Sequence, residues 1–572
     1  MAEYLSPGVY VEEFDSGPKA MEGVSTSTAG FIGLAKRGPV TGKPVLITGL
    51  SQFRSMFGGY LDAAVKYRHL AYGIDQFFTN GGSCCYVMRV ASASDTTAAM
   101  TLEQDGVALH LKAGSVGAWG NEVRVTMQKQ RLIKTNILEE ARDEQQRIVR
   151  VKSISGYETG DLVELVSGDG KEYNRIISVR EGELELERSF TLPYADSNLL
   201  PSIFLHRIGF ILQAECDGMV ETYNVTCNTA AADFVNRVMT KGILLQGTFT
   251  IEDETVEKLE AWLTQFQLND ALYTGFLKDG KTVVEEGAEL FLGEDKGPGK
   301  RSGLEAFKEV DDVSIMAIPG VTIPEVQSAL VAHCEGLTNR FAILDMPVDT
   351  RSVDEMQTHR SYFDSSYGAI YHPWLQMFDP LLKTNSFFPP SASMAGIYAR
   401  TDNSRGVFKA PANEVVRGCT GLSVNYNETE QGKVNPKGIN LIRALPGQGI
   451  RVWGARTMSS DASWKYINVR RLFIYVEESI RANTNWAVFE PNDANLWMRV
   501  EGTIHMFLNT LWRSGALVGS SEDEAFFINI GPSTMTQDDI LNGRLICVIG
   551  IAPVRPAEFV IFRITQKMQE LS

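Results

Sequence analysis

The chain has 572 residues, of which 44% are hydrophobic and 22% are charged. This composition is ordinary for globular proteins, and the length provides for several domains. The net charge of −16 argues against a nucleic-acid partner, since phosphate neutralisation needs a basic face. No apolar run approaches the ~18 residues of a membrane span, and the first residues lack the pattern of a signal peptide, so we expect a cytoplasmic protein without membrane insertion.

The first predicted element is a short strand formed by Val9, Tyr10, Val11 and Glu12. Pro7 and Gly8 open it, and DSGP at 15–18 separates it from the sequence that follows. A strand of about five residues cannot bury enough surface to hold itself in place. It is therefore either an extended arm that pairs with another subunit or a strand that folds back into the sheet of its own chain.

The residues from 23 to 95 have the pattern of an α/β unit. A strand is expected at 24–34 and another at 85–90, and between them apolar residues recur at helical spacing at Leu70, Ile74, Phe77 and Phe78. GPVTGKP at 38–44 is not a phosphate-binding loop, because its glycines are one residue too close and Pro44 replaces the Ser or Thr that binds magnesium.

From 96 to 200 the pattern changes to short strands bounded by turns. Strands are expected at 107–111, 122–127, 161–166, 174–179 and 182–186. The strict alternation of ELELE at 183–187 is typical of a half-buried antiparallel sheet. We predict an inserted all-β module, either a small barrel or a sandwich. The charged stretch at 138–147 fits either a solvated helix or a connection.

Helices and strands alternate again from 201 to 405. The apolar runs at 313–320 and 340–347 are typical of strands that are covered on both faces, and the residues from 325 to 336 have helical spacing. These patterns predict an α/β domain.

The residues from 406 to 555 form the last predicted domain, which has α+β character. Amphipathic helices are expected at 464–481 and 492–513. The first has an apolar stripe, and its other faces carry the charged residues Arg470, Arg471, Glu477, Glu478 and Arg481. Glu477 and Arg481 have the spacing of an i,i+4 ion pair. Such charged faces are usually solvated surfaces, and the alternative is a reversible contact with another protein.

The chain closes with two strand-like runs that PVRP at 553–556 separates. Because each proline removes an amide donor and fixes one dihedral angle, the second run should leave the domain as a semi-rigid arm. This predicted arm contains Phe559, Val560, Ile561, Phe562 and Arg563. Its open edge requires a partner, which strand addition between subunits would supply.

The sequence contains no recognisable catalytic or metal-binding pattern. The seven histidines show no HExxH or paired spacing, and the seven cysteines form no CxxC pair. We interpret the cysteines as small buried apolar residues. We therefore expect no enzymatic activity, no cofactor and no metal.

Five segments together resemble one known family: SPGVYVEE at 6–13, GVSTSTAGFIG at 23–33, NVRRLFIYVEESI at 468–480, FEPNDANLWMRVEGTIHMFLNTLWRSGAL at 489–517 and GRLICVIGIAPVRPAEFVIFRI at 543–564. They are similar to the tail sheath proteins of contractile phages and of phage-derived contractile injection systems. The likeness covers both ends and much of the last third, and it is weakest between about residues 100 and 230.

The resemblance implies a structural subunit that polymerises helically, in stacked rings, around an inner tube and contracts to drive the tube through a target envelope. Baseplate and terminal cap proteins would be further partners, with no cofactor. The middle domain would be a subtilisin-like α/β fold used structurally. The last domain would face the tube through charged contacts, for which we select Arg470, Arg471, Glu477, Glu478 and Arg481. Assembly would take place in the cytoplasm of the producing cell, within a phage tail or an injection particle.

The predicted fold class is therefore α/β and α+β multidomain. Its divisions are an N-terminal arm at 1–22, a first α/β part at 23–95, a β-rich insertion at 96–200, an α/β domain at 201–405, a C-terminal domain at 406–555 and a C-terminal arm at 556–572. Two other functions stay open: a cytoplasmic hydrolase that uses the middle domain, and a non-contractile tail or adhesion component. The hydrolase is disfavoured because the chain lacks the His-Gly-Thr and Gly-Thr-Ser segments of a subtilisin-type triad.

Overall fold

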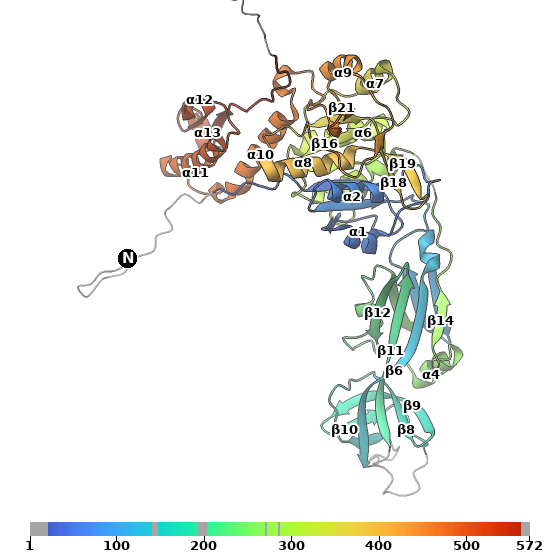
Figure 1. Ribbon diagram of the computed structural model, residues 1–572. Helices are drawn as coiled ribbons and strands as arrows, with labels where there is room; N and C mark the ends of the chain where they lie inside the picture. The colour runs from blue at the N-terminus through green and yellow to red at the C-terminus, as the bar shows by residue number, and fades with distance from the viewer. Residues whose placement is uncertain (1–20, 140–146, 193–202, 269–270, 284–286, 562–572) are drawn as a thin grey trace, which may run out of the picture.

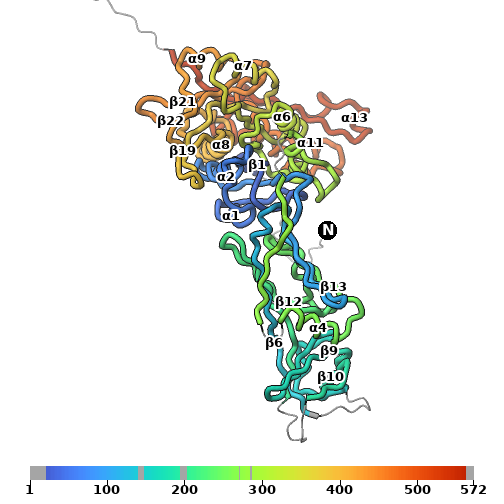
Figure 2. Tube along the Cα trace, turned by 90° about the vertical axis from the view of Figure 1, so that its right-hand side faces the viewer, coloured from blue at the N-terminus to red at the C-terminus, as the bar shows by residue number. Residues whose placement is uncertain are grey.

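The computed structural model describes residues 21–139, 147–192, 203–268, 271–283 and 287–561. It has three parts: a body built on one large sheet, a long β-rich projection that extends from the body, and a C-terminal lobe beside the body (Figure 1). The view in Figure 2 shows the same elongated projection below the body. The chain is thus a multidomain protein with α/β and α+β parts, as predicted.

The body sheet has eight strands in the order β2-β3-β1-β15-β16-β17-β21-β22. The central strands are parallel, and β2 and β22 add antiparallel edges. The strands are β1 (Ala29–Leu34), β2 (Val45–Ile47), β3 (Cys85–Val90), β15 (Ile315–Ala317), β16 (Phe341–Asp345), β17 (Gly368–His372), β21 (Ile439–Leu445) and β22 (Gly449–Val452). A smaller sheet beside it contains β18 (Leu375–Asp379), β19 (Thr384–Phe388) and β20 (Gly421–Leu422).

Helices cover both faces of the body sheet. One face packs against α1 (Leu50–Phe57), α2 (Leu70–Thr79) and α8 (Ser391–Arg405), and the other against α6 (Pro324–Leu337), α7 (Val353–Arg360) and α9 (Glu428–Val434). Consecutive residues of one strand therefore enter different cores, as Phe31 and Ile32 do. This burial explains the continuous apolar runs, and it confirms the predicted strands at 85–90 and 340–347 and the helix at 325–336.

The projection consists of two sheets and two helices. Its elements are β4 (Ala99–Gln104), β5 (Val107–Ala113), β6 (Arg124–Glu139), β7 (Ile148–Val151), β8 (Leu162–Ser167), β9 (Gly170–Arg180), β10 (Glu183–Leu186), β11 (Phe204–Cys216), β12 (Met219–Val225), α3 (Val235–Val238), β13 (Leu245–Ile251), α4 (Val256–Gln265) and β14 (Tyr273–Phe276). Because β6 pairs with both β7 and β11, the outer strands close into a barrel, in the order β6-β7-β10-β9-β8-β11. Of the two expected forms, a small barrel or a sandwich, these strands therefore form the barrel. Of the charged stretch at 138–147, β6 includes the first two residues, and 140–146 lie outside the described residues.

The predicted end of the insertion at residue 200 is wrong. β11 pairs with β6, β13 pairs with β5 and β14 pairs with β6, so the projection continues to about residue 283. The boundary was misplaced because the pairing strands are far apart in the sequence, as Ile251 and Val107 are. The residues after position 200 therefore carry no local pattern that assigns them to the insertion.

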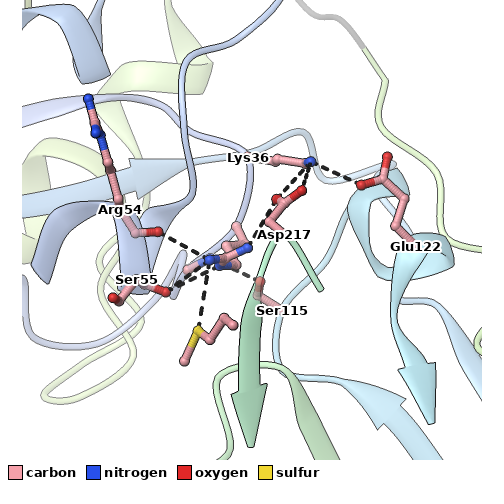
Figure 3. Close-up of polar contacts among 9 residues, drawn as sticks. Lys36, Arg54, Ser55, Ser115, Glu122 and Asp217 are labelled. Atoms are coloured by element: carbon pink, nitrogen blue, oxygen red, sulfur yellow. Dashed lines mark hydrogen bonds and ion pairs between the residues drawn. The ribbon is translucent and has the colours of Figure 1, made fainter. Parts of the chain in front are cut away.

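A cluster of polar contacts connects the projection with the body (Figure 3). The ammonium group of Lys36 lies 2.9 Å from a carboxylate oxygen of Asp217 and 3.0 Å from one of Glu122. Beside them, the buried guanidinium of Arg89 donates hydrogen bonds to the body carbonyls of Ala35 and Gly38 and to the projection carbonyl of Val116. A buried cation needs such partners, so these bonds hold the two parts together.

The C-terminal lobe packs α10 (Ile467–Asn483) and α11 (Ala494–Arg513) with α12 (Glu522–Ala525) around a two-stranded sheet, β23 (Phe526–Ile530) and β24 (Cys547–Ile551). Two short helices, α5 (Glu289–Leu292) and α13 (Gln537–Leu541), complete the α-helices and strands of the described residues. The helices expected at 464–481 and 492–513 are confirmed. The boundary expected at 406 is wrong, because β21 and β22 belong to the body sheet. No helix within the described residues is long and apolar enough to cross a membrane.

Candidate functional site: the anchorage of the terminal segments on α10

The segment at 21–28 lies along α10 and leads to the N-terminus of the chain. The Asn483 side chain donates a hydrogen bond to the Glu22 carbonyl over 2.8 Å, and the Val24 amide donates to the Ser479 hydroxyl over 3.2 Å. A Cβ atom at Gly23 would lie 1.8 Å from the Tyr475 hydroxyl, so only glycine permits this close approach. The path of the segment is thereby fixed by side chains of one helix.

A buried ion pair strengthens this attachment. Arg471 and Asp402 form a salt bridge of 2.6 Å, and the side chain of each is only 3% exposed. The same two side chains bind Thr26: Arg471 donates to its carbonyl over 2.9 Å, and its hydroxyl donates to Asp402 over 2.7 Å. The pair thus joins α10, α8 and the N-terminal segment at one point.

These contacts correct part of the prediction for the charged face of α10. Arg471 is buried as just described, and the Arg470 guanidinium lies 3.5 Å from the centre of the Trp464 ring and donates to Ser366. Both side chains are therefore buried within the protomer. Because α10 lies between the body and the lobe, the N-terminal part of its polar face is covered as well as its apolar stripe, which periodicity alone does not reveal. The remaining three residues lie further along the helix.

Of those three residues, Glu477 and Arg481 are exposed and Glu478 is partly exposed. Arg481 forms its ion pair with Glu478, at i,i+3, and not with Glu477 at i,i+4 as predicted.

The C-terminal segment is anchored near the start of the same helix. The Asn468 side chain donates to the Val554 carbonyl over 2.9 Å. Four residues further on, Glu558 accepts hydrogen bonds from Arg456 over 2.6 and 2.8 Å, from Asn435 over 2.6 Å and from Tyr466 over 3.2 Å. We call this arrangement the Glu558 clamp. We did not predict this clamp from the sequence, although a single carboxylate between Pro556 and an apolar run could have indicated it.

The Glu558 clamp should be sensitive to acid. Partial burial alone would raise the pKa of Glu558, but the hydrogen bonds from Arg456 and Asn435 outweigh it and hold the pKa below its ordinary value of 4.5. A lowered carboxyl pKa means that the clamp contributes its full stability above about pH 4.5 and loses it as the pH falls through the folded-state pKa.

We expect hydrogen exchange at the Val554 amide, which bonds to the Ala516 carbonyl, to accelerate about tenfold below that pH after correction for intrinsic rates. Glu558→Gln should give the faster exchange at every pH, while amides of β16 report on global stability. Equal protection in both proteins from about pH 3 to 7 would refute the role of the clamp.

Beyond the clamp, the chain presents three exposed apolar residues. Phe559, Val560 and Ile561 are 71%, 70% and 79% exposed, and within the described residues they belong to no sheet. The other arm residues, which are Val9, Tyr10, Val11, Glu12, Phe562 and Arg563, lie outside the described residues. In the same lobe, the β23–β24 sheet has only two strands in the part of the chain described, with Phe527 52% and Val548 45% exposed. The sheet is supported by the helices that pack against it, and its exposed apolar residues, like those of the C-terminal segment, would be buried by contact with another chain.

The remaining polar clusters have structural partners. Asp345 at the end of β16 is 1% exposed and accepts hydrogen bonds from the Ser391 hydroxyl and amide and from the Gly320 amide. Burial raises its pKa to about 6. This serine bonds a carboxylate directly and not an imidazole, so the pair lacks the geometry of a catalytic triad and serves to tie β16 to α8.

One group of potential metal ligands occurs in the described residues, formed by Glu122, Cys216 and Asp217. The Lys36 ammonium already binds both carboxylates. The buried guanidinium of Arg37 lies 3.4 Å from Asp217 as well, so two cations compensate the two carboxylates without a metal.

Family models match most of the chain. The phage tail sheath protein central domain matches residues 294–458, the phage tail sheath C-terminal domain matches 459–567, and the N-terminal domain of DUF2586 matches 17–371. The division at 458 falls shortly before α10, where the lobe begins in the structure.

Individual relatives agree with these matches. A Pseudomonas aeruginosa protein (strain UCBPP-PA14) named as a prophage major tail sheath protein is 27% identical over 296 residues, which cover 49% of this chain and 73% of that protein. The tail sheath protein of Escherichia phage P2 is 24% identical over 254 residues, which cover 42% of this chain and 63% of that protein.

Among solved structures, the sheath complex of an extracellular contractile injection system, PVC, in its contracted state aligns over 99% of both chains. The TM-score is 0.55 and the sequence identity is 21%. At this identity the alignment establishes the shared fold. With the family models and the curated relatives, it leads to one conclusion: the chain belongs to the contractile tail sheath family.

Proposed function

We propose that the chain is the structural subunit of a contractile sheath, which polymerises helically around an inner tube and contracts to drive the tube through a target envelope. The observation that carries this proposal is the anchorage on α10. Both terminal segments are held at their attachment points by buried or partly buried polar contacts, and the C-terminal segment then presents exposed apolar residues. A strand that is exchanged between subunits needs a fixed attachment to its own protomer and a free end that can pair with another.

We infer that the acceptor for such a strand is the β23–β24 sheet of a neighbouring copy. Each open edge of this sheet has backbone donors and acceptors with which an added strand could form hydrogen bonds. Every second side chain of the added strand could pack against the exposed apolar residues of the sheet. The N-terminal arm that contains Val9, Tyr10, Val11 and Glu12 would pair in the same way. Subunits connected by strands stay joined while their bodies rotate between an extended and a contracted assembly.

The body would serve as a subtilisin-like scaffold without catalysis. The parallel sheet with helices on both faces supports this assignment, and the direct Asp345–Ser391 bond argues against a hydrolase. Glu477, Glu478 and Arg481 stay candidates for a tube contact through weak ion pairs. Baseplate and cap proteins would bind the ends of the sheath. Assembly would occur in the cytoplasm of the producing cell, within a phage tail or an injection particle.

Electron microscopy of the purified protein tests this function. Negative staining should reveal hollow cylinders with regular cross-striations, because rings of subunits stack along the axis. Dispersed monomers at every concentration and salt condition, also in the presence of the inner tube protein, would refute the sheath assignment. Turnover of peptide or ester substrates that disappears in Ser391→Ala would favour the hydrolase instead.

A further inference from the structure

Phe489 is the most exposed large apolar residue in the described chain. Its side chain has a relative exposure of 102%, and the adjacent Val488 is 61% exposed. Phe489 also has a backbone φ of +67°, in the left-handed region that bulky residues rarely adopt. Such strain persists only where the surrounding structure imposes it, and it concentrates at functional positions.

The loop that carries Phe489 is held on both sides. Before it, the amide of Val488 donates to the carbonyl of Asn485 over 3.2 Å, and the Arg499 guanidinium lies 4.5 Å from the centre of the Trp486 ring. After it, the Asn492 side chain donates to the carbonyl of Arg544 over 3.0 Å. A flexible tip would let the phenyl ring fold back onto the protein. This loop instead keeps the ring in the solvent.

The loop also lies between the N-terminal segment and β24, the two elements through which we propose that subunits are connected. On one side it follows Asn483, which binds Glu22, and its residue Trp486 packs in the same apolar cluster as Met21, where the N-terminal segment leaves the described structure. On the other side, Arg544 directly precedes the run that enters β24. A neighbouring copy attached through these elements would lie against the loop.

We propose that Val488 and Phe489 form an apolar knob that inserts into the surface of a second copy of this chain. We call these two residues the 488–489 knob. The inference rests on the proposed function, because it assigns a further contact to the same polymer. The knob would fix the angle between neighbouring subunits, which the strands alone leave free. Burial of a fully exposed phenyl ring would also offset the backbone strain that Phe489 carries in the free protomer.

Phe489→Asn tests the knob, because asparagine accepts a left-handed backbone more readily than phenylalanine and removes the apolar contact. We expect an unchanged melting temperature and a critical concentration for polymerisation that rises roughly 10- to 100-fold, the loss expected for one buried phenylalanine. Phe276→Thr is the matched control, since Phe276 is 50% exposed on β14 of the projection, and it should polymerise normally. Equal polymerisation of Phe489→Asn and the unchanged protein would overturn the knob. Equal impairment of both variants would overturn it as well.

A photoreactive benzoylphenylalanine at position 489 identifies the occupant. In cylinders assembled from a mixture of ¹⁵N-labelled and unlabelled protein, crosslinked peptides of mixed label establish contact between copies. Crosslinks confined to residues 1–20 of the same chain, or to the tube protein, would overturn the proposal. If the unchanged protein forms no cylinders at all, the sheath function itself fails, which distinguishes the two outcomes.

Discussion

Phe559→Asp combined with Ile561→Asp should give a soluble, folded protomer that no longer forms cylinders. In an extended strand these two residues point to the same face, so both would be buried when the strand joins a neighbour's sheet. Burial of each side chain contributes about 1.5–3 kcal/mol, and a buried unpaired carboxylate reverses this gain. Circular dichroism and thermal melting should match the unchanged protein, because both residues are exposed in the protomer.

Val560→Asp is the matched control for this pair. It introduces the same charge at a residue of similar exposure, but on the opposite face of the strand. We expect cylinders at a moderately higher protein concentration. Normal assembly of the double variant, or equal loss of assembly in the control, would show that a specific apolar face of the arm is not what joins the subunits.

Asp402→Ala should cause the largest loss of protomer stability, about 3–5 kcal/mol in the free energy of unfolding. The substitution leaves the Arg471 guanidinium buried without its counter-ion and removes the acceptor of the Thr26 hydroxyl. Because both terminal segments are anchored on α10, polymerisation should fail as well. Chemical denaturation monitored by fluorescence measures the first effect, and sedimentation of assembled material measures the second.

Arg481→Ala provides the comparison on the same helix. Its pair with Glu478 is exposed on the arginine side, and such surface pairs contribute about 0–1 kcal/mol. A small effect of Asp402→Ala, comparable to that of Arg481→Ala, would mean that the buried pair does not hold the helix, the body and the N-terminal segment together.

The local sequence pattern predicted individual helices and strands better than it predicted the domain to which each belongs. The apolar run at 340–347 and the helical spacing at 464–481 correspond to β16 and α10, because burial on both faces or on one stripe determines those patterns. The extent of the projection depends on pairing between strands that lie more than a hundred residues apart, such as β5 and β13. Such pairing has no local signature, so residues 201–283 were assigned to the wrong domain.

The candidate site shows the same limit. The arms could be located from proline spacing and apolar composition, and Glu477 and Arg481 are exposed as a charged face predicts. Arg470 and Arg471 have the same residue type and the same local pattern, yet they are buried against Trp464 and Asp402. The buried and the exposed charged residues of α10 differ only in how the helix packs between the body and the lobe. This packing depends on segments that are distant in the sequence, so the local pattern does not indicate it.

If the terminal segments of each protomer pair with neighbouring protomers, a high-resolution electron cryomicroscopy map of the assembled cylinder will show this pairing. We expect continuous density from the Glu558 clamp to a strand that pairs with the β23–β24 sheet of a different protomer. Density in which the residues after Glu558, and those before Met21, pair only with the sheets of their own protomer would contradict it.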